Sequence, residues 1–165
     1  TCALPISHTF LKESTTTPDA SNMRFGLVVA EWNSHITDVL LDQAVCALLS
    51  AGAKKENIII KRVPGSFELI FGCSELARYK GVDGIIAIGS VIRGDTPHFD
   101  YICNGVTQEL ARQNSTGEVP IIYGLLTTEN EHQAIERIDG TVGRKGEEFA
   151  MTAIKMIDFS WSLKK

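Results

Sequence analysis

Four short, strongly apolar segments alternate with longer amphipathic stretches along the chain, and this alternation limits the possible folds more than any other feature. The segments are rich in isoleucine and valine, and they are FGLVVA (25–30), NIIIKRV (57–63), GIIAIGSV (84–91) and PIIYGLL (120–126). Strands with apolar residues on both faces are expected where helices cover both sides of a parallel sheet. The pattern therefore predicts four buried, parallel strands.

Helical patterns occupy the stretches between and after these segments. Apolar residues recur at helical spacing at 36–51, 66–79, 99–113 and 147–159. Thr128 and Glu131 have the spacing of a capping box, which would open a further helix after the fourth strand. Strands joined by helices in this order form right-handed crossovers, so we expect an α/β fold with helices on both faces of the sheet.

The composition is that of one globular domain. The 165 residues suffice for a single core. Residues 12–22 are polar and rich in turn formers, so we expect a flexible arm over 1–22 and one domain over 23–165. The net charge of −4, without a long run of lysine or arginine, argues against nucleic acid or an anionic membrane as a partner. No apolar run reaches the ~18 residues of a membrane span.

The four cysteines, Cys2, Cys46, Cys73 and Cys103, show no CxxC spacing. Three of them fall within apolar helical patterns, so we expect buried free thiols and no metal site. Free thiols favour a reducing compartment, and the cytoplasm is the expected location. Because the sequence begins with Thr1, N-terminal processing and a plastid location stay open as the alternative.

Ligands of open parallel sheets bind beyond the carboxyl ends of the strands, so the turns after the four strands are the candidate site. Trp32 lies in a polar turn after the first strand, where its ring could stack on a heterocycle or simply cover the edge of the sheet. After the second strand, Ser66 could cap the next helix and Glu68 could complement its dipole. Alternatively, Glu68 and the backbone N–H groups of 66–68 could hold a ligand with amide and hydroxyl groups.

The turn after the third strand carries the strongest chemical signal. Pro97 fits the first position of a helix, with Asp95 or Thr96 as its N-cap. A helix N-terminus after a flexible glycine presents N–H donors to an anion, commonly phosphate. His98, next to that anion site, could relay a proton as a neutral imidazole, and a purely structural histidine is the alternative. The pattern indicates a phosphate-containing ligand with a planar ring.

Taken together, five segments resemble the 6,7-dimethyl-8-ribityllumazine synthase family in order and spacing, over a region from about Arg24 to Phe159. They are VPGSFE (63–68), SVIRGDTPHFDYIC (90–103), GLLTTEN (124–130), QAIERIDG (133–140) and GRKG with TAIKM (143–146 and 152–156). The resemblance implies a three-layer α/β sandwich with a four-stranded parallel sheet in flavodoxin-like order, flanked by helices. An N-terminal edge strand could be added to it.

The family condenses 5-amino-6-(D-ribitylamino)uracil with 3,4-dihydroxy-2-butanone 4-phosphate, and releases phosphate and water without a metal or redox cofactor. The resemblance therefore implies a transferase of riboflavin biosynthesis with small-molecule substrates. A non-catalytic flavin- or lumazine-binding shell protein is the alternative. The family also implies a homo-oligomer, a pentamer that assembles into an icosahedral shell, with riboflavin synthase as a partner.

The resemblance also implies a role for each matched residue. His98 would transfer protons, and Asn33 and Lys145 are further candidates near the ligands. The pyrimidine substrate would contact Trp32, Ser66, Phe67, Glu68, Ser90, Val91, Ile92 and Tyr123. The butanone phosphate would contact Asp95, Thr96 and Arg137. Each site would be shared by two subunits, with Tyr123 and Arg137 supplied by the neighbour.

Overall fold

The computed structural model describes residues 16–117 and 119–164, and it contains one parallel sheet. Its strands are β1 (Phe25–Ala30), β2 (Ile58–Val63), β3 (Gly84–Ile92) and β4 (Ile121–Thr128). They lie in the order β2-β1-β3-β4, and every pair is parallel. The predicted α/β class and flavodoxin-like strand order are confirmed.

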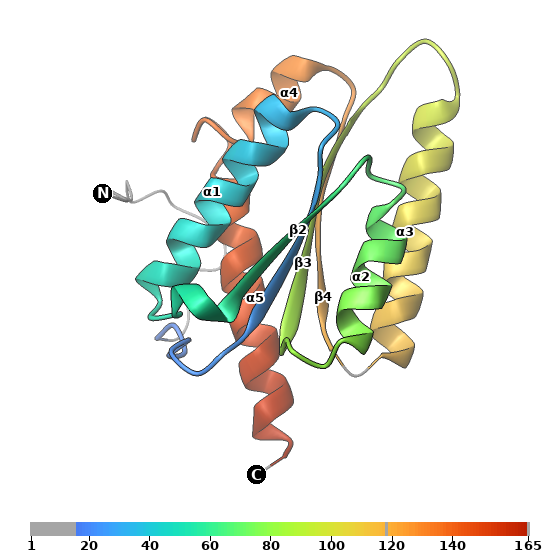
Figure 1. Cartoon of the computed structure of the whole chain (residues 1–165). Coiled ribbons are helices and arrows are strands. Elements are labelled where there is room, and N and C mark those ends of the chain that lie inside the picture. The colour runs from blue at the N-terminus through green and yellow to red at the C-terminus, as the bar shows by residue number, and fades with distance from the viewer. Residues whose placement is uncertain (1–15, 118, 165) are drawn as a thin grey trace.

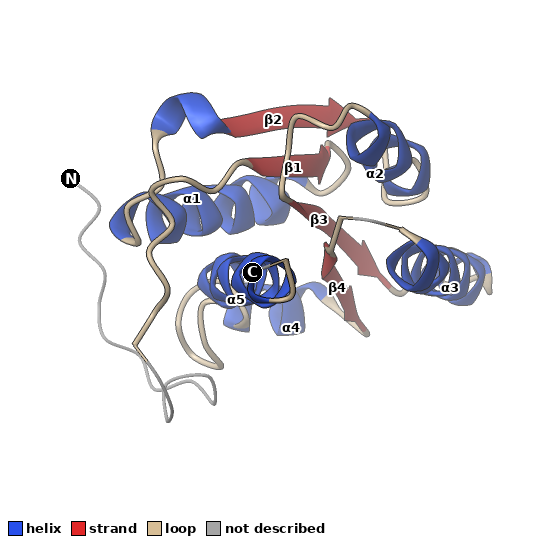
Figure 2. Cartoon of the chain, turned by 90° about the horizontal axis from the view of Figure 1, so that it is seen from below, coloured by secondary structure: helices blue, strands red, loops and turns tan. Residues whose placement is uncertain are grey.

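Helices cover both faces of the sheet and make the fold three layers deep. They are α1 (Ser34–Ser50), α2 (Leu69–Arg78), α3 (His98–Thr116), α4 (Glu131–Glu136) and α5 (Lys145–Ser162), with a 3₁₀ turn, η2, at Lys55–Asn57. Figure 1 shows α1, α2 and α3 antiparallel to the strands that they follow. Figure 2 shows α1, α4 and α5 on one face and α2 and α3 on the other. Among the residues described, no helix combines the length and apolar character that crossing a bilayer requires.

The buried side chains form two clusters, one on each face of the sheet. Alternate residues of β1 and β3, such as Leu27 and Ile86, pack with α1 and α5, whereas their neighbours Val28 and Ile85 pack with α2 and α3. All four of these side chains are buried to at least 99%, as expected of strands with apolar residues on both faces. The two clusters hold the turns at the ends of the strands on a rigid base.

The edge strand β2 differs from the prediction of full burial. Ile60 is 43% exposed, and Lys61 and Arg62 are exposed as well. In the described sheet β2 pairs only with β1, so its outer side lacks the coverage that β1 and β3 receive. Charged side chains on an edge strand discourage pairing with another chain, which explains Lys61 and Arg62 in an otherwise apolar segment.

The expected helix starts are wrong at three places. β4 extends to Thr128, so the cap of α4 is Asn130, whose side chain accepts a hydrogen bond of 2.9 Å from the Gln133 N–H. Pro97, instead of Asp95 or Thr96, is the N-cap of α3, because that helix begins only at His98. Glu68, instead of Ser66, is the N-cap of α2, because 64–68 form a tight turn first.

The part of the N-terminal arm that the structure describes packs against the end of α1. The Ala20 N–H donates to the Ala51 carbonyl oxygen at 3.0 Å, and Met23 is 1% exposed. The predicted additional edge strand would come from the arm over 1–22. Its described part, 16–22, contains no strand, and residues 1–15 lie outside the described residues.

The cysteines fit the prediction of free thiols only in part. Cys73 and Cys103 are free, and burial raises the pKa of the Cys73 thiol to about 12, so it is unreactive at neutral pH. Cys46 is disulfide-bonded, which corrects the prediction at that position. Cys2 lies outside the described residues.

A buried amide side chain joins α1 to the segment between α4 and α5. Gln43 is 3% exposed; its Nε2 donates to the Ile138 carbonyl oxygen at 2.6 Å and its Oε1 accepts from the Gly146 N–H at 3.1 Å. A Cβ on Gly146 would stand 2.3 Å from the Leu40 carbonyl oxygen, so only glycine allows α5 to begin this close to α1. These contacts fix both ends of the segment that carries Arg137 and Lys145.

We expect Gln43→Leu to destabilise the protein, because the Ile138 carbonyl and the Gly146 N–H would lose their buried partner. The loss of about 1–3 kcal/mol should lower the melting temperature by roughly 2–12 °C at a fixed protein concentration. Gln108→Leu, at an exposed position of α3, serves as the control and should melt close to the unsubstituted protein. Equal melting of the two variants would show that Gln43 does not hold this segment.

Candidate active site

The carboxyl ends of the four strands lie at the same end of the sheet, at the top of Figure 1. The turns that follow them are 31–33, 64–68, 93–97 and 129–130. The turn between β3 and α3 rises furthest beyond the sheet in this view. These turns contain most of the residues that the sequence singles out.

Backbone hydrogen bonds tie the turn after β1 to the turn after β2. The Glu31 N–H donates to the Val63 carbonyl oxygen at 2.8 Å, and the Trp32 N–H to that of Pro64 at 3.1 Å. The Trp32 side chain is 73% exposed, so its ring is open to a ligand instead of packing over the edge of the sheet. A flat aromatic surface therefore stands directly beside the 64–68 turn.

Asn33 connects this pair of turns to β3. Its backbone is left-handed, with φ of 59°, a conformation that asparagine tolerates better than most residues. Its side-chain Nδ2 donates to the Ser90 carbonyl oxygen at 3.0 Å. The structure therefore brings Trp32, the 64–68 turn and Ser90 together with Asn33, which the resemblance had named only as a further candidate.

The end of β3 extends beyond the end of β1. β1 pairs with β3 only as far as Ile88, whereas β3 and β4 continue together to the pair Ile92 and Thr128. In the described sheet, residues 90–92 therefore pair on the β4 side only, and we call them the β3 ledge. Ser90 is 1% exposed and its Oγ has no hydrogen-bond partner in the described structure, while Val91 and Ile92 are half-buried.

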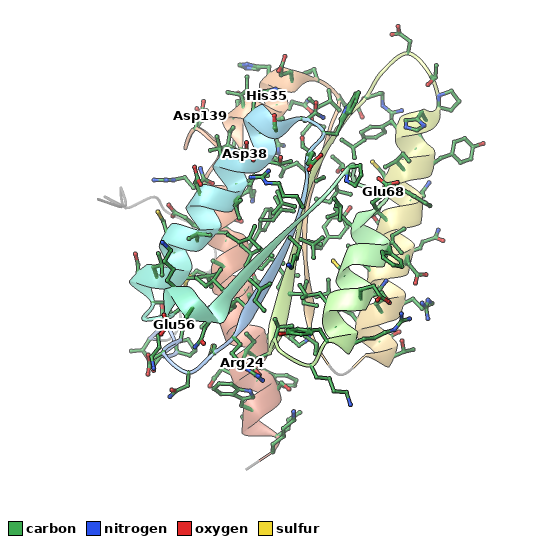
Figure 3. The ribbon with its side chains drawn as sticks, in the orientation of Figure 1. Arg24, His35, Asp38, Glu56, Glu68 and Asp139 are labelled. Carbon is green, nitrogen blue, oxygen red and sulfur yellow. The ribbon has the colours of Figure 1, made fainter. Side chains whose placement is uncertain are left out.

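In the 64–68 turn, Ser66 is 7% exposed, whereas Phe67 is 52% exposed and Glu68 is exposed. Figure 3 shows Glu68 at the start of α2, on the side of the sheet that α3 covers. The Phe67 ring reaches α3, where its Cε2 lies 3.5 Å from the place of a Cβ on Gly105. These side chains border the same region as the Trp32 turn.

The turn between β3 and α3 is open to solvent. Asp95, Thr96 and His98 are all exposed, and a Cβ on Gly94 would meet nothing within 4 Å. α3 has no side-chain cap at its N-terminus, so its first N–H groups are available to an anion. Asp95, Thr96 and His98 therefore lie where a phosphate group could be bound.

Arg93, which the sequence analysis did not single out, holds both ends of this turn. Its guanidinium forms two hydrogen bonds to the Asp100 carboxylate, of 2.9 and 3.1 Å, and one of 2.7 Å to Glu129. The Arg93 guanidinium holds the pKa of the Asp100 carboxyl below its usual value, and Asp100 in turn raises the pKa of Arg93. The signal in the sequence is an arginine at a strand end, seven residues before an acid in a helix.

Arg137 and Lys145 lie on the face of the sheet that α1, α4 and α5 cover. Arg137 follows α4, and its Nη1 donates to the Gln133 carbonyl oxygen at 2.7 Å, while no carboxylate forms an ion pair with it among the described residues. Lys145 donates its N–H to the Arg137 carbonyl oxygen at 3.0 Å, and its Nζ pairs with Glu148 at 2.8 Å. The structure gives no hydrogen bond or ion pair between these two residues and His98 of the same chain.

At the carboxyl end of the sheet, α4 is also joined to α1. His35 Nε2 lies 2.6 Å from Glu131 Oε1, which connects the first turns of the two helices. Figure 3 shows His35 at the top of α1, with Asp139 on the segment that follows α4. Among residues 16–117 and 119–164, no group of three or more His, Cys, Asp or Glu side chains is arranged to hold a metal ion.

Tyr123 of β4 is separated from Phe67 by α3. Tyr123 is 41% exposed, its hydroxyl lies 2.8 Å from Thr107 Oγ1, and burial raises its pKa. Thr107 and Gly105 are two residues apart on α3, which corresponds to roughly 200° around the helix. Phe67 and Tyr123 of one chain therefore contact opposite sides of α3 instead of a common cavity.

Comparison with known proteins agrees with this arrangement. The model of the family described as 6,7-dimethyl-8-ribityllumazine synthase matches residues 22–160. A protein of this name from Bacteroides fragilis is 59% identical over 143 residues, which cover 87% of this chain and 100% of that protein. Another from Phocaeicola vulgatus is 54% identical over 148 residues, which cover 90% of this chain and 88% of that protein. The chain therefore belongs to the 6,7-dimethyl-8-ribityllumazine synthase family.

Proposed function

We propose that this protein condenses 5-amino-6-(D-ribitylamino)uracil with 3,4-dihydroxy-2-butanone 4-phosphate to form 6,7-dimethyl-8-ribityllumazine. One observation carries the proposal. The exposed ring of Trp32, the β3 ledge and the uncapped N-terminus of α3 with His98 all lie at the carboxyl end of the sheet. The product gives the family its name, and the curated relatives bear the same name.

The pyrimidine substrate fits the region around Trp32. Its ring would stack on the exposed indole, and its ribityl chain would bind to Ser66, Phe67 and Glu68. The β3 ledge supports a further contact, because a strand pairs with it on the β4 side only. Asn33 occupies the Ser90 carbonyl oxygen, and the remaining open N–H and C=O groups of the ledge can meet the polar edge of a heterocycle. Asn33 would hold this arrangement together through its hydrogen bond to Ser90.

The butanone phosphate fits beside the β3–α3 turn. Asp95 and Thr96 would lie against it, and the N–H groups at the start of α3 favour a negatively charged phosphate. Arg137 is suited to supply the countercharge, since no carboxylate in the described structure neutralises it. Lys145 is a weaker candidate for that role, because Glu148 pairs with its Nζ.

The reaction requires two reactants to be held together while protons are moved. The pyrimidine amine attacks the ketone, and loss of one water gives an imine. Elimination breaks the bond between carbon and the phosphate oxygen, after which the ribityl-bearing nitrogen closes the second ring with loss of another water. Holding the reactants in place can contribute about 7–11 kcal/mol, and proton transfer by His98 about 10²–10⁴-fold in rate.

The site is expected to be completed by a neighbouring subunit. In one chain, β2 and β4 are opposite edges of the sheet, and α3 lies between Phe67 and Tyr123. A neighbour's Tyr123 and Arg137 can approach the 64–68 turn and His98 without this obstacle. We therefore propose a site shared between neighbouring subunits. Membership of the family supports the further proposal of a ring of five subunits, assembled into an icosahedral shell, with riboflavin synthase as a partner. The bacterial relatives support the cytoplasm as the location.

Turnover with both substrates tests the function directly. The purified protein should form a product with the absorbance and fluorescence of the lumazine, and phosphate should be released in equal amount. Omission of either substrate provides the control. Binding of the pyrimidine and the lumazine without turnover would contradict an enzymatic role.

For His98→Ala we expect kcat to fall by about 10²-fold, while the affinity for the pyrimidine substrate stays close to its original value. Slow turnover should persist, because both reactants are still held together. His132→Ala, at an exposed position of α4, is the control and should keep full activity. A His98→Ala variant of normal rate would remove this residue from proton transfer.

For Arg137→Ala we expect kcat/KM for the butanone phosphate to fall by about 10- to 100-fold, since a charge-assisted bond to phosphate is lost. The affinity for the pyrimidine should change little. Arg78→Ala, at the opposite end of the sheet, is the matched control. An equal loss of affinity for both substrates would mean that Arg137 supports the fold instead of binding phosphate.

Mixed assemblies test whether the site is shared. If His98 and Arg137 of one site come from different subunits, subunits carrying His98→Ala and Arg137→Ala, unfolded and reassembled together in equal amounts, should restore about a quarter of the sites. Activity should then clearly exceed the sum of the separately assembled variants. Activity no higher than that sum would show that each site lies within one subunit.

A further inference from the structure

We propose that Arg93 is a positioning residue that holds the β3–α3 turn, and with it His98, in the geometry that the reaction needs. The proposal rests on the proposed function. Arg93 directly follows β3 and precedes Gly94, so it stands at the point where the chain leaves the sheet.

The turn has few contacts of its own that could fix its shape. Residues 94–98 are all exposed, and a Cβ on Gly94 would touch nothing within 4 Å. No side chain caps the N-terminus of α3. Because the middle of the turn is unsupported, its conformation must be imposed from its two ends.

Arg93 contacts both of these ends. Its N–H donates to the Thr128 carbonyl oxygen at 2.9 Å, which anchors the first end to β4. Its guanidinium holds Asp100 through two hydrogen bonds, and its Cζ lies 4.2 Å from the centre of the Phe99 ring, which is 9% exposed. The chain thus leaves the sheet at Arg93. The side chain of Arg93 also holds Phe99 and Asp100, the two residues directly after His98.

The third contact of the guanidinium reaches the turn after β4. Arg93 Nε donates to Glu129 at 2.7 Å, and Glu129 directly precedes Asn130, the N-cap of α4. Two carboxylates neutralise the charge of Arg93, so it is poorly suited to bind phosphate. Arg137 differs in this respect, since no carboxylate of the described structure pairs with it.

We expect Arg93→Ala to lower kcat by about 10- to 100-fold and to leave KM for the pyrimidine substrate within about threefold, because small displacements of a reacting group are costly. Arg93→Lys should restore only part of the rate, since an ammonium group cannot bridge Asp100 and Glu129 and stack on Phe99 at once. Arg24→Ala is the matched control, because Arg24 forms a similar pair with Asp83 at the other end of the sheet. Its kcat should stay within about twofold.

A double variant separates positioning of His98 from a general structural role. If Arg93 acts through His98, Arg93→Ala should lower kcat by less than about threefold in a His98→Ala background. A full, multiplicative loss in that background would overturn the proposal, as would an unchanged kcat in the single variant. A raised KM for the butanone phosphate at unchanged kcat would instead make Arg93 a binding group, which also overturns it.

Hydrogen exchange gives a readout that does not depend on activity. The N–H groups of Asp100 and Tyr101 hydrogen bond to the Pro97 carbonyl oxygen, at 3.0 and 3.4 Å. Their exchange should be at least about fivefold faster in Arg93→Ala and unchanged in Arg24→Ala. If the unsubstituted protein shows no turnover, the proposed function fails, and this measurement still decides whether Arg93 holds the turn. Unchanged exchange in Arg93→Ala would overturn the proposal.

Discussion

The parallel pairing of four strands in one register governs everything at the candidate site. Ala30 of β1 stands level with Val63 of β2, so the turns that carry Trp32 and Ser66 begin at the same height and can exchange backbone hydrogen bonds. β3 and β4 run further together, and Arg93 and Glu129 leave the sheet side by side beyond Ile92 and Thr128. The site therefore has two levels, an aromatic one over β1 and β2 and a charged one over β3 and β4.

Much of this architecture could be predicted because the governing signals are local. The segments around Leu27 and Ile86 are apolar on both faces, and only a strand covered by helices on both sides satisfies them. The parallel order then places the turns with Trp32 and His98 at the same end of the sheet. Recognition of the family required more than this, because the roles of individual residues came from matched segments and not from the hydrophobic pattern.

Two of the predictions that were wrong, the start of α4 and the full burial of β2, depend on contacts made far along the chain. The helix after β4 begins late because β4 continues to Thr128 in order to pair with Ile92, which the spacing of Thr128 and Glu131 does not reveal. β2 is half-exposed because it is an edge strand. Its own residues do not show this, because the order of the strands depends on all four of them. Arg93 escaped notice for the same reason, because its partners Asp100 and Glu129 approach only when two helices and two strands are assembled.

The β3 ledge has a consequence for how this site can change during evolution. A ligand bound along residues 90–92 would be recognised by main-chain groups, and a point substitution leaves those groups in place. Val91 and Ile92 could then vary while recognition is retained, whereas the insertion or deletion of a single residue in β3 would exchange donors for acceptors along the ledge. Recognition of this kind tolerates drift in side chains and is lost when the length of the strand changes.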